Sequence, residues 1–380
     1  MRRSIPLFLL LAAGQALPQP PAPVSSPQEV RAAMGIPSTE SLRGQQDTLG
    51  YASTAEQMAR IWALAEAAPA PESLGPLPAP GIAGAILPHD DYLYAGPVCR
   101  RVAPLITART VVLVGVFHKY RRFGARDRII FDPYPAWRSP EGPIPVSSLR
   151  ERLLTLLPEG EFARDAAGHD AEHSLEALAY WLRHQRPDLE ILPILVPAAS
   201  FERFQAMASH LGSALAVLMK RRGLQLGKDV AIVISSDGTH YGSDFHHTPF
   251  GPGGVAAYTR TLARDRELLR GPLAGPLSPA KARTFFEACV DPERPDEYRA
   301  TWCGRFSIPF GMLLLEATAR GLGEPVPTGL PLFLGSSVDT PGLPVKALGL
   351  GTTAPANLYH FVAHPAVAFV GKPMAKEEGR

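Results

Sequence analysis

Two apolar runs decide the fold of this chain: TVVLVGV at residues 110–116 and VAIVISS at residues 230–236. Both are rich in β-branched residues, and neither alternates apolar with polar residues as a strand with one wet face does. A strand that is apolar on both faces is typical of the centre of a parallel sheet, where helices cover both sides. Shorter runs at residues 81–87 and 190–196 predict two more such strands.

Segments with helical periodicity separate these strands. In each of them apolar residues recur three and four positions apart. Helices are predicted at residues 55–68, 149–157, 171–186, 201–222, 255–270 and 309–320, and late strands at residues 345–351 and 367–370. Because strands alternate with helices over the whole length, we expect an α/β fold, a three-layer αβα arrangement around a mostly parallel sheet.

The composition is that of a folded protein without nucleic-acid partners. The 380 residues are 46% hydrophobic and 19% charged, which supports a large core and excludes global disorder. The net charge is only +2, whereas a nucleic-acid binder carries a larger positive excess. The three cysteines, Cys99, Cys289 and Cys303, are too few and too far apart for a disulfide framework. No internal apolar run reaches the roughly 18 residues of a membrane span.

The N-terminus resembles an export signal. Arg2 and Arg3 precede an apolar stretch at residues 5–13, and Gly14 and Ala16 are small residues of the kind a signal peptidase reads. The alternative is an N-terminal strand. We predict a signal peptide at residues 1–16, a Pro-rich linker at 17–49, a single α/β domain at 50–374 and a charged tail at 375–380. Cleavage would leave an exported, periplasmic protein without a stable membrane span.

Polar residues that can hold a metal or move a proton follow three of the predicted strands directly. His89 follows residues 81–87, His118 follows residues 110–116, and Asp237 and His240 follow residues 230–236. Ligands in open α/β sheets bind at the carboxyl ends of the strands. A single histidine there is most often structural, but three such strand ends predict a functional site.

Three further residues are candidates for this site. Glu172 and His173 are expected to open the helix after Asp170, where capping of the helix is an equally good interpretation. Cys303 precedes a predicted helix and Arg305, an environment expected to lower the pKa of a thiol. Cys99 and Cys289 are interpreted as small buried residues.

Five motifs occur in order over residues 81–360, and together they resemble the Memo family. The family patterns are PHAGY-x-Y-x-G, GPSHH, DEHSxE, SSDFxHxG and CGRxPI. The corresponding stretches here are PHDDYLYAG at 88–96, GVFHK at 115–119, AEHSLE at 171–176, SSDGTHYG at 235–242 and CGRFSI at 303–308. The chain departs from the patterns at Asp90, Asp91, Lys119, Ala171 and Ser307.

The resemblance implies a fold like that of the class III extradiol dioxygenases and a single metal ion held by His89, His118 and Cys303. It places Asp237, His240, Glu172 and His173 in the same cleft as catalytic residues. Two imidazoles and one thiolate leave coordination positions open, which is typical of a reactive site. This donor set suits iron or copper, with zinc as an alternative.

An extradiol-like reaction would bind a catecholate and dioxygen at the metal. His240 or His173 would accept the hydroxyl proton, and Asp237 would orient that histidine. Tyr92, Lys119 and Arg305 are the expected substrate-binding residues. The basic run from Lys119 to Arg128 would attract a small anionic aromatic substrate.

Two other functions are compatible with the same residues. One is a periplasmic protein that binds copper or iron without turnover, and the weaker one is a zinc hydrolase with an activated water. The metal held by the protein from its native host would separate the hydrolase from the oxygenase, and tight metal binding without oxygen consumption on catechols would favour the protein without turnover. No protein partner is predicted from the sequence.

If residues 1–16 are a signal, the mature protein begins just after Ala16. Mass spectrometry of the intact protein from its native host should then show a chain that lacks residues 1–16. Soluble protein that retains Met1 to Ala16 would contradict the prediction.

Overall fold

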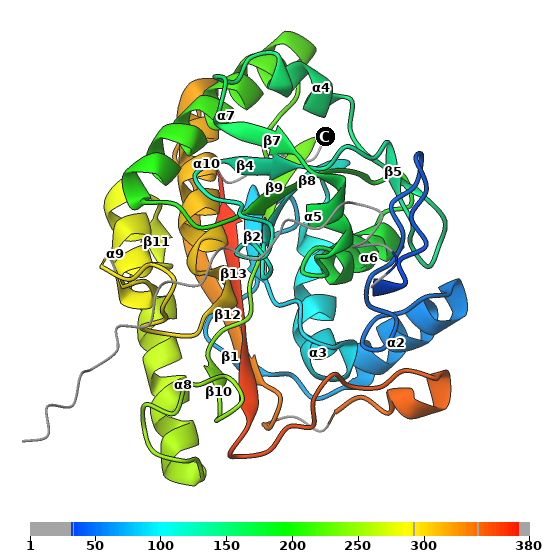
Figure 1. The fold of residues 1–380 in the computed structure, drawn as a ribbon, viewed down its shortest axis with the longest axis vertical. Coiled ribbons are helices and arrows are strands. Elements are labelled where there is room, and N and C mark those ends of the chain that lie inside the picture. Colours follow the sequence, from blue (N-terminus) through cyan, green and yellow to red (C-terminus); the bar gives the residue numbers. More distant parts are fainter. Residues whose placement is uncertain (1–31, 33, 292, 340–341, 372–380) are drawn as a thin grey trace, which may run out of the picture.

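Four parallel strands form the centre of the sheet in the computed structural model (Figure 1). Their spatial order is β2 (Gly84–Leu87), β9 (Val230–Ser235), β3 (Thr110–Val116) and β8 (Glu190–Val196). Each neighbouring pair is parallel, and nearly every residue of the four strands is buried. The predicted central strands are therefore confirmed, because apolar residues on both faces require cover on both sides.

Antiparallel strands extend the sheet at both ends. Beside β2 lie β13 (Phe361–Val370) and then β12 (Thr328–Ser336), and beside β8 lies β4 (Ile129–Phe131). The remaining strands are short: β1 (Glu72–Ser73) and β11 (Gly275–Pro276) on β12, β10 (His240–Tyr241) on β13, β7 (Phe162–Arg164) on β4, and the separate pair β5 (Ala136–Trp137) and β6 (Ile144–Pro145).

Helices cover both faces of the sheet, which gives the predicted three layers (Figure 1). One face carries α7 (Phe201–Arg222), α9 (Pro279–Cys289) and α10 (Ser307–Leu322); the other carries α2 (Ala55–Ala67), α3 (Tyr92–Val102) and α6 (Glu176–Gln185); and α8 (Val255–Arg270) packs on β12 and β13. Shorter helical segments are η1 (Ala103–Leu105), α4 (Leu149–Leu154), α5 (Ala166–Asp170), η2 (Cys303–Arg305) and η3 (Val345–Leu348).

The bounds of α7 match the sequence prediction because both ends carry clear signals. The Ser200 hydroxyl accepts the Arg203 N–H at the start, and Gly223 takes a left-handed conformation with φ 65° after the last turn.

One predicted strand and the start of one predicted helix are wrong. Residues 345–351 contain the short 3-10 helix η3 (Val345–Leu348) and no strand, because Gly349 turns the chain with φ 77° and only part of this surface segment is buried. The helix predicted at 171–186 begins only at Glu176. The Glu172 carboxylate accepts the backbone N–H groups of His173 and Ser174, and such local bonds compete with helix formation.

The structure describes residues 32, 34–291, 293–339 and 342–371. The predicted signal peptide, about half of the predicted linker and the charged tail lie outside these residues. None of the described helices is both long and apolar enough to cross a membrane.

The described end of the predicted linker is packed against the domain, so the boundary predicted at Gly50 falls too late. Arg43 is 1% exposed, its N–H donates to the carbonyl of Ala136, and its carbonyl accepts from the N–H of Arg138. This pairing adds residue 43 to the small sheet of β5 and β6. The sequence misled here because the many prolines before residue 30 suggested a tether for the whole segment.

A buried ion pair holds this N-terminal segment in place. The Arg43 guanidinium contacts the Glu176 carboxylate, stacks 4.1 Å above the Trp137 ring, and donates to the carbonyls of His169 and Glu172. Glu176 also accepts the N–H groups of Gln46 and Asp47. The pair thus fixes both the segment before Gly50 and the turn that carries Glu172 and His173.

Arg43→Ala should lower the free energy of unfolding by about 3–5 kcal/mol, because Glu176 would keep a buried charge without its partner. Urea unfolding followed by circular dichroism measures the change. Arg294→Ala is the control, since Arg294 pairs with Glu297 at the surface and should change stability by less than about 1 kcal/mol. Equal effects of the two substitutions would contradict the assigned role of Arg43.

Candidate metal centre

A cavity of about 750 Å³ opens at the carboxyl ends of the central strands. His89, His118 and Asp237 each lie two residues beyond the last residue of β2, β3 and β9, respectively. These three strands are neighbours in the sheet, as predicted, so all three side chains reach the floor of the cavity. His173, His240, Lys119 and Cys303 line the same cavity.

His89 presents one ring nitrogen to the cavity because the other is held. Its Nδ1 lies 2.8 Å from the Ser235 hydroxyl, and that hydroxyl donates its proton to the Ser174 carbonyl at 2.5 Å. Ser235 must therefore accept from His89, which places the proton on Nδ1 and leaves a lone pair on Nε2. Burial lowers the pKa of His89 well below its usual value, so the ring is neutral and ready to bind a metal.

His118 is oriented by Glu172. Its Nδ1 lies 2.9 Å from Oε1 of Glu172, and its backbone N–H donates to Oε2 at 2.7 Å. This leaves Nε2 directed away from Glu172, as in metal sites where a carboxylate holds the far nitrogen of a histidine ligand. Burial lowers the pKa of His118, but the Glu172 carboxylate outweighs this and raises it, so a metal would have to displace a proton.

Glu172 lies behind His118 and does not line the cavity. The structure therefore gives it a positioning role in place of the predicted catalytic one. It is 3% exposed, and its two oxygens accept N–H groups from His118, His173 and Ser174. Although burial raises its pKa, His118 and these hydrogen bonds lower it well below the usual value. Glu172 is thus an ionised positioning residue.

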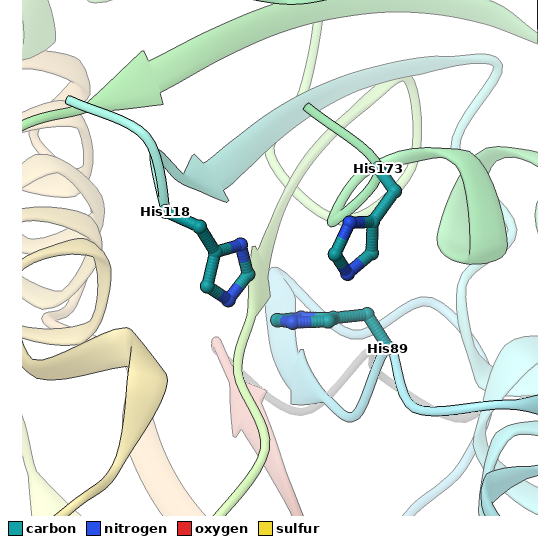
Figure 2. Close-up of side chains that lie close together, drawn as sticks. All are labelled: His89, His118 and His173. Atoms are coloured by element: carbon teal, nitrogen blue, oxygen red, sulfur yellow. The ribbon is translucent and has the colours of Figure 1, made fainter. Parts of the chain in front are cut away.

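Three imidazoles converge above the ends of the strands (Figure 2). His118 and His173 stack with ring centroids 5.1 Å apart and an angle of 8° between their planes, and His89 stands nearly edge-on to both. One nitrogen from each ring lies within 4.8 Å of the others. His89 and His118 thus belong to one group of candidate metal ligands.

A second group of donors shares His89 and adds a thiol and a carboxylate. Ligand atoms of His89, Asp237 and Cys303 also lie within 4.8 Å of one another, and all three residues are buried. Nε2 of His89 is 3.7 Å from Sγ of Cys303 and 3.4 Å from Oδ2 of Asp237. The two groups form one candidate metal centre with His89 in common, and the particular set His89, His118 and Cys303 stays a prediction.

The thiol of Cys303 differs from the sequence expectation in its pKa. Burial, and then the nearby Asp237 carboxyl, raise the pKa of Cys303 well above its usual value. The predicted lowering of this pKa is wrong, and the Arg305 guanidinium lies 3.5 Å from the centre of the Tyr298 ring. The backbone N–H of Asp237 does donate to Sγ at 3.1 Å, which favours a thiolate once a cation is present.

Asp237 braces the loop after β2. Its Oδ1 accepts the backbone N–H groups of His89 and Asp90 at 2.9 and 3.1 Å. Burial and the neighbouring Asp90 raise the pKa of Asp237 to about 7. Asp90 in turn accepts from Nε2 of the fully buried His364 on β13 at 2.8 Å.

His240 is held by carbonyl groups and not by Asp237, which corrects the predicted orientation. Its Nδ1 lies 3.1 Å from the carbonyl oxygens of Gly238 and Thr301, so Nδ1 carries the proton and Nε2 is left as a base. Burial lowers the pKa of His240 to about 4, which keeps this nitrogen unprotonated at neutral pH.

A buried carboxylate on α8 connects the segments that carry His240 and Cys303. Asp265 accepts from the Thr239 hydroxyl at 2.7 Å and from the indole N–H of Trp302 at 2.8 Å. Thr239 and Trp302 each precede the corresponding site residue.

Two of the three predicted substrate-binding residues lie outside the cavity lining. Tyr92 is buried in the core, where its hydroxyl donates to the Ala177 carbonyl at 3.0 Å. Arg305 is 2% exposed beneath Tyr298. Lys119 does line the cavity, and its Nζ donates to the Ala171 carbonyl at 2.9 Å.

Sequence reasoning missed several residues of the site. Ser235 fixes the tautomer of His89, and its position directly before the strand end was a usable signal. The N-terminal segment contributes Gln46, Asp47 and Tyr51 to the cavity, and the Tyr51 hydroxyl donates to the His89 carbonyl. Nothing in the spacing of the motifs connects these residues to the strand ends.

The donor set fits a transition-metal ion. Two imidazoles with their far nitrogens held, a buried thiol and a carboxyl group suit zinc, copper or iron better than the oxygen-preferring calcium or magnesium. The fold and the site together define an α/β protein with a candidate transition-metal site at the carboxyl edge of its sheet. The chain belongs to the Memo-like protein family, whose sequence profile matches residues 53–322. The resemblance found in its motifs is thereby confirmed.

Curated relatives carry the same family name. A MEMO1 family protein of Methanosarcina barkeri is 34% identical over 163 residues, which are 42% of this chain and 55% of the relative. A MEMO1 family protein of Thermococcus onnurineus is 28% identical over 177 residues, 44% of this chain and 56% of the relative. The chain therefore spans little more than half the length of the curated relatives that it matches.

Glu172→Gln should weaken metal binding about 10–100-fold, because the neutral amide no longer holds Nδ1–H of His118 as a carboxylate does. Anaerobic titration with ferrous iron or copper measures the affinity. Glu141→Gln is a matched control, since Glu141 bonds Nδ1 of His184 at 2.7 Å outside the cavity lining. An unchanged affinity in Glu172→Gln would contradict the assigned role of the Glu172 carboxylate in orienting His118.

Proposed function

We propose that this protein is a metal-dependent oxidoreductase that acts on small aromatic diols, with one iron or copper ion held by His89, His118 and Cys303. The observation that carries the proposal is the pair of imidazoles whose Nδ1 atoms are held by Ser235 and Glu172. Both rings direct Nε2 toward the same cavity as a buried thiol. When bound, the ion would supply Lewis acidity and electron transfer to dioxygen at its open positions.

The residues around these donors have roles of their own. Nε2 of His240 lines the cavity unprotonated and accepts a proton from a substrate hydroxyl. His173, stacked on His118, is the second base within the cavity. Tyr94, Phe245 and Tyr298 supply aromatic walls for a planar ring and displace water from it.

Extradiol cleavage is the reaction that this arrangement supports best. It would consume one dioxygen per catechol and break the ring C–C bond beside the diol. Both oxygen atoms of dioxygen end in the ring-opened product, so no further reductant is needed. An oxygen electrode with a panel of catechols, on iron-loaded protein, tests the reaction directly.

Cys303→Ala should weaken binding of ferrous iron or copper by more than about 100-fold, which exceeds the effect of losing a group that only orients a ligand. Cys289→Ala is the matched control, since Cys289 is equally buried but lies outside the cavity lining at the end of α9. If Cys303→Ala binds as tightly as the parent and Asp237→Asn does not, the third ligand is Asp237.

His240→Asn should lower kcat about 10²–10⁴-fold with little change in metal affinity, because the base is lost while the donors remain. His210→Asn serves as the control on an exposed histidine outside the cavity lining. Tight metal binding by the parent without oxygen uptake on any catechol would favour a metal-binding protein without turnover. Zinc in the protein from its native host, together with ester hydrolysis, would favour the hydrolase.

A further inference from the structure

The charge of the cavity lining is opposite to what the basic run after His118 suggested. The carboxyl groups in the lining belong to Asp47, Asp90, Asp91, Asp237 and Asp244, whereas Lys119 is the one Lys or Arg among the lining residues that the structure describes. Two of these carboxyl groups are engaged in the framework of the site. Asp90 pairs with His364, and Asp237 braces His89.

The arginines of the basic run do not face the cavity. Arg126 makes two hydrogen bonds of 2.7 and 2.6 Å to the Asp296 carboxylate, and Arg121 contacts the same residue. Lys119 itself is bonded to the Ala171 carbonyl. The expected attraction of an anionic substrate therefore has little basis in the structure.

The net charge of the cavity lining stays negative when a bound metal ion is included. A divalent ion with the Cys303 thiolate adds one positive charge, and Lys119 adds another. Asp47, Asp91 and Asp244 together carry three negative charges against these two. Of Asp47 and Asp244, Asp47 attracts a bound cation more strongly. Asp47 is half-buried, whereas 81% of the Asp244 side chain is exposed and solvent screens its charge.

A free acceptor lies next to Asp47. Gln46 lines the cavity, and its buried amide oxygen has no hydrogen-bond partner among the described residues. An unpaired buried acceptor is costly unless a ligand or water donates to it. The ring of Tyr51 lies in the same wall, 6.3 Å from the ring of His173. Amide oxygen, carboxylate and aromatic ring together are the groups that bind an organic ammonium ion.

We propose that the cavity selects an aromatic substrate with a protonated amine, which is bound by Gln46, Asp47 and Tyr51. The inference rests on the proposed function in placing the diol at the metal donors. The ammonium group donates to the Gln46 and Asp47 oxygens, and the aromatic ring lies between this wall and that of Phe245. Phe245 is itself fixed by stacking on His360 at 4.6 Å.

Three catechols that differ only in the charge of the side chain test the proposal. Dopamine, 4-ethylcatechol and 3-(3,4-dihydroxyphenyl)propionate are cationic, neutral and anionic, and calorimetry on zinc-loaded protein without oxygen compares their affinities. We expect dopamine to bind at least about 10-fold more tightly than the propionate at low salt, with a smaller ratio at high salt. Equal or tighter binding of the propionate would overturn the proposal.

Two substitutions locate the ammonium group. Asp47→Asn and Gln46→Met should each weaken dopamine binding about 5-fold and leave 4-ethylcatechol unchanged, because only the charged end loses a partner. The amide oxygen in Asp47→Asn would still accept the N–H groups of Leu49 and Gly50 that the carboxylate accepts now, so the local turn is kept. Asp188→Asn controls for surface charge outside the cavity lining. Equal losses for dopamine and 4-ethylcatechol would contradict the assignment.

Failure of the proposed function is distinguishable from failure of this inference. If 4-ethylcatechol does not bind, the catechol assignment fails, and phenethylamine and 3-phenylpropionate then test the charge preference without a diol. Preference for phenethylamine that Asp47→Asn removes would support the ammonium subsite, and no preference would overturn it.

Discussion

The parallel pairing of β2, β9 and β3 is the constraint on which the site depends. Parallel strands all end at the same edge of a sheet, so residues at equal distances beyond three neighbouring strands meet in space. His89, Asp237 and His118 are such residues. Helices packed on each face cover these strands and hold them in place. The core thus determines where the candidate ligands lie.

Hydrogen bonds on the far side of the candidate ligands fix which atom each ligand presents to the cavity. An imidazole can bind a metal through either nitrogen, and the partner of the other nitrogen makes the choice. Ser235 holds Nδ1 of His89 and Glu172 holds Nδ1 of His118, so Nε2 of each ring is left for a metal. Ionised Glu172 is stable in the interior because N–H donors surround it, and Arg43 fixes the turn that carries it. The N-terminal segment is therefore part of the site although it lies far from the strand ends in sequence.

Sequence patterns predicted what depends on local periodicity. Apolar runs located the central strands and the long helices, and strand ends located His89, His118 and Asp237. Side-chain direction could not be predicted in this way. Tyr92 lies within the site motif at 88–96 but points into the core, and a buried Glu176 gives no sign that its partner is residue 43. The sign of the charge in the cavity also depends on which arginines are already paired, and only the fold shows that Asp296 engages Arg126.

Two departures from the Memo family patterns are neighbours in the structure. Lys119 stands where the pattern GPSHH has its second histidine, and Ala171 stands where DEHSxE begins with an aspartate. Nζ of Lys119 donates to the Ala171 carbonyl at 2.9 Å. Asp90 stands where the family pattern PHAGY has an alanine. The added negative charge of Asp90 is paired with His364 on β13. Lys119 and Asp90 therefore change the charge of the cavity lining relative to the family patterns, while His89, His118 and Cys303 match those patterns.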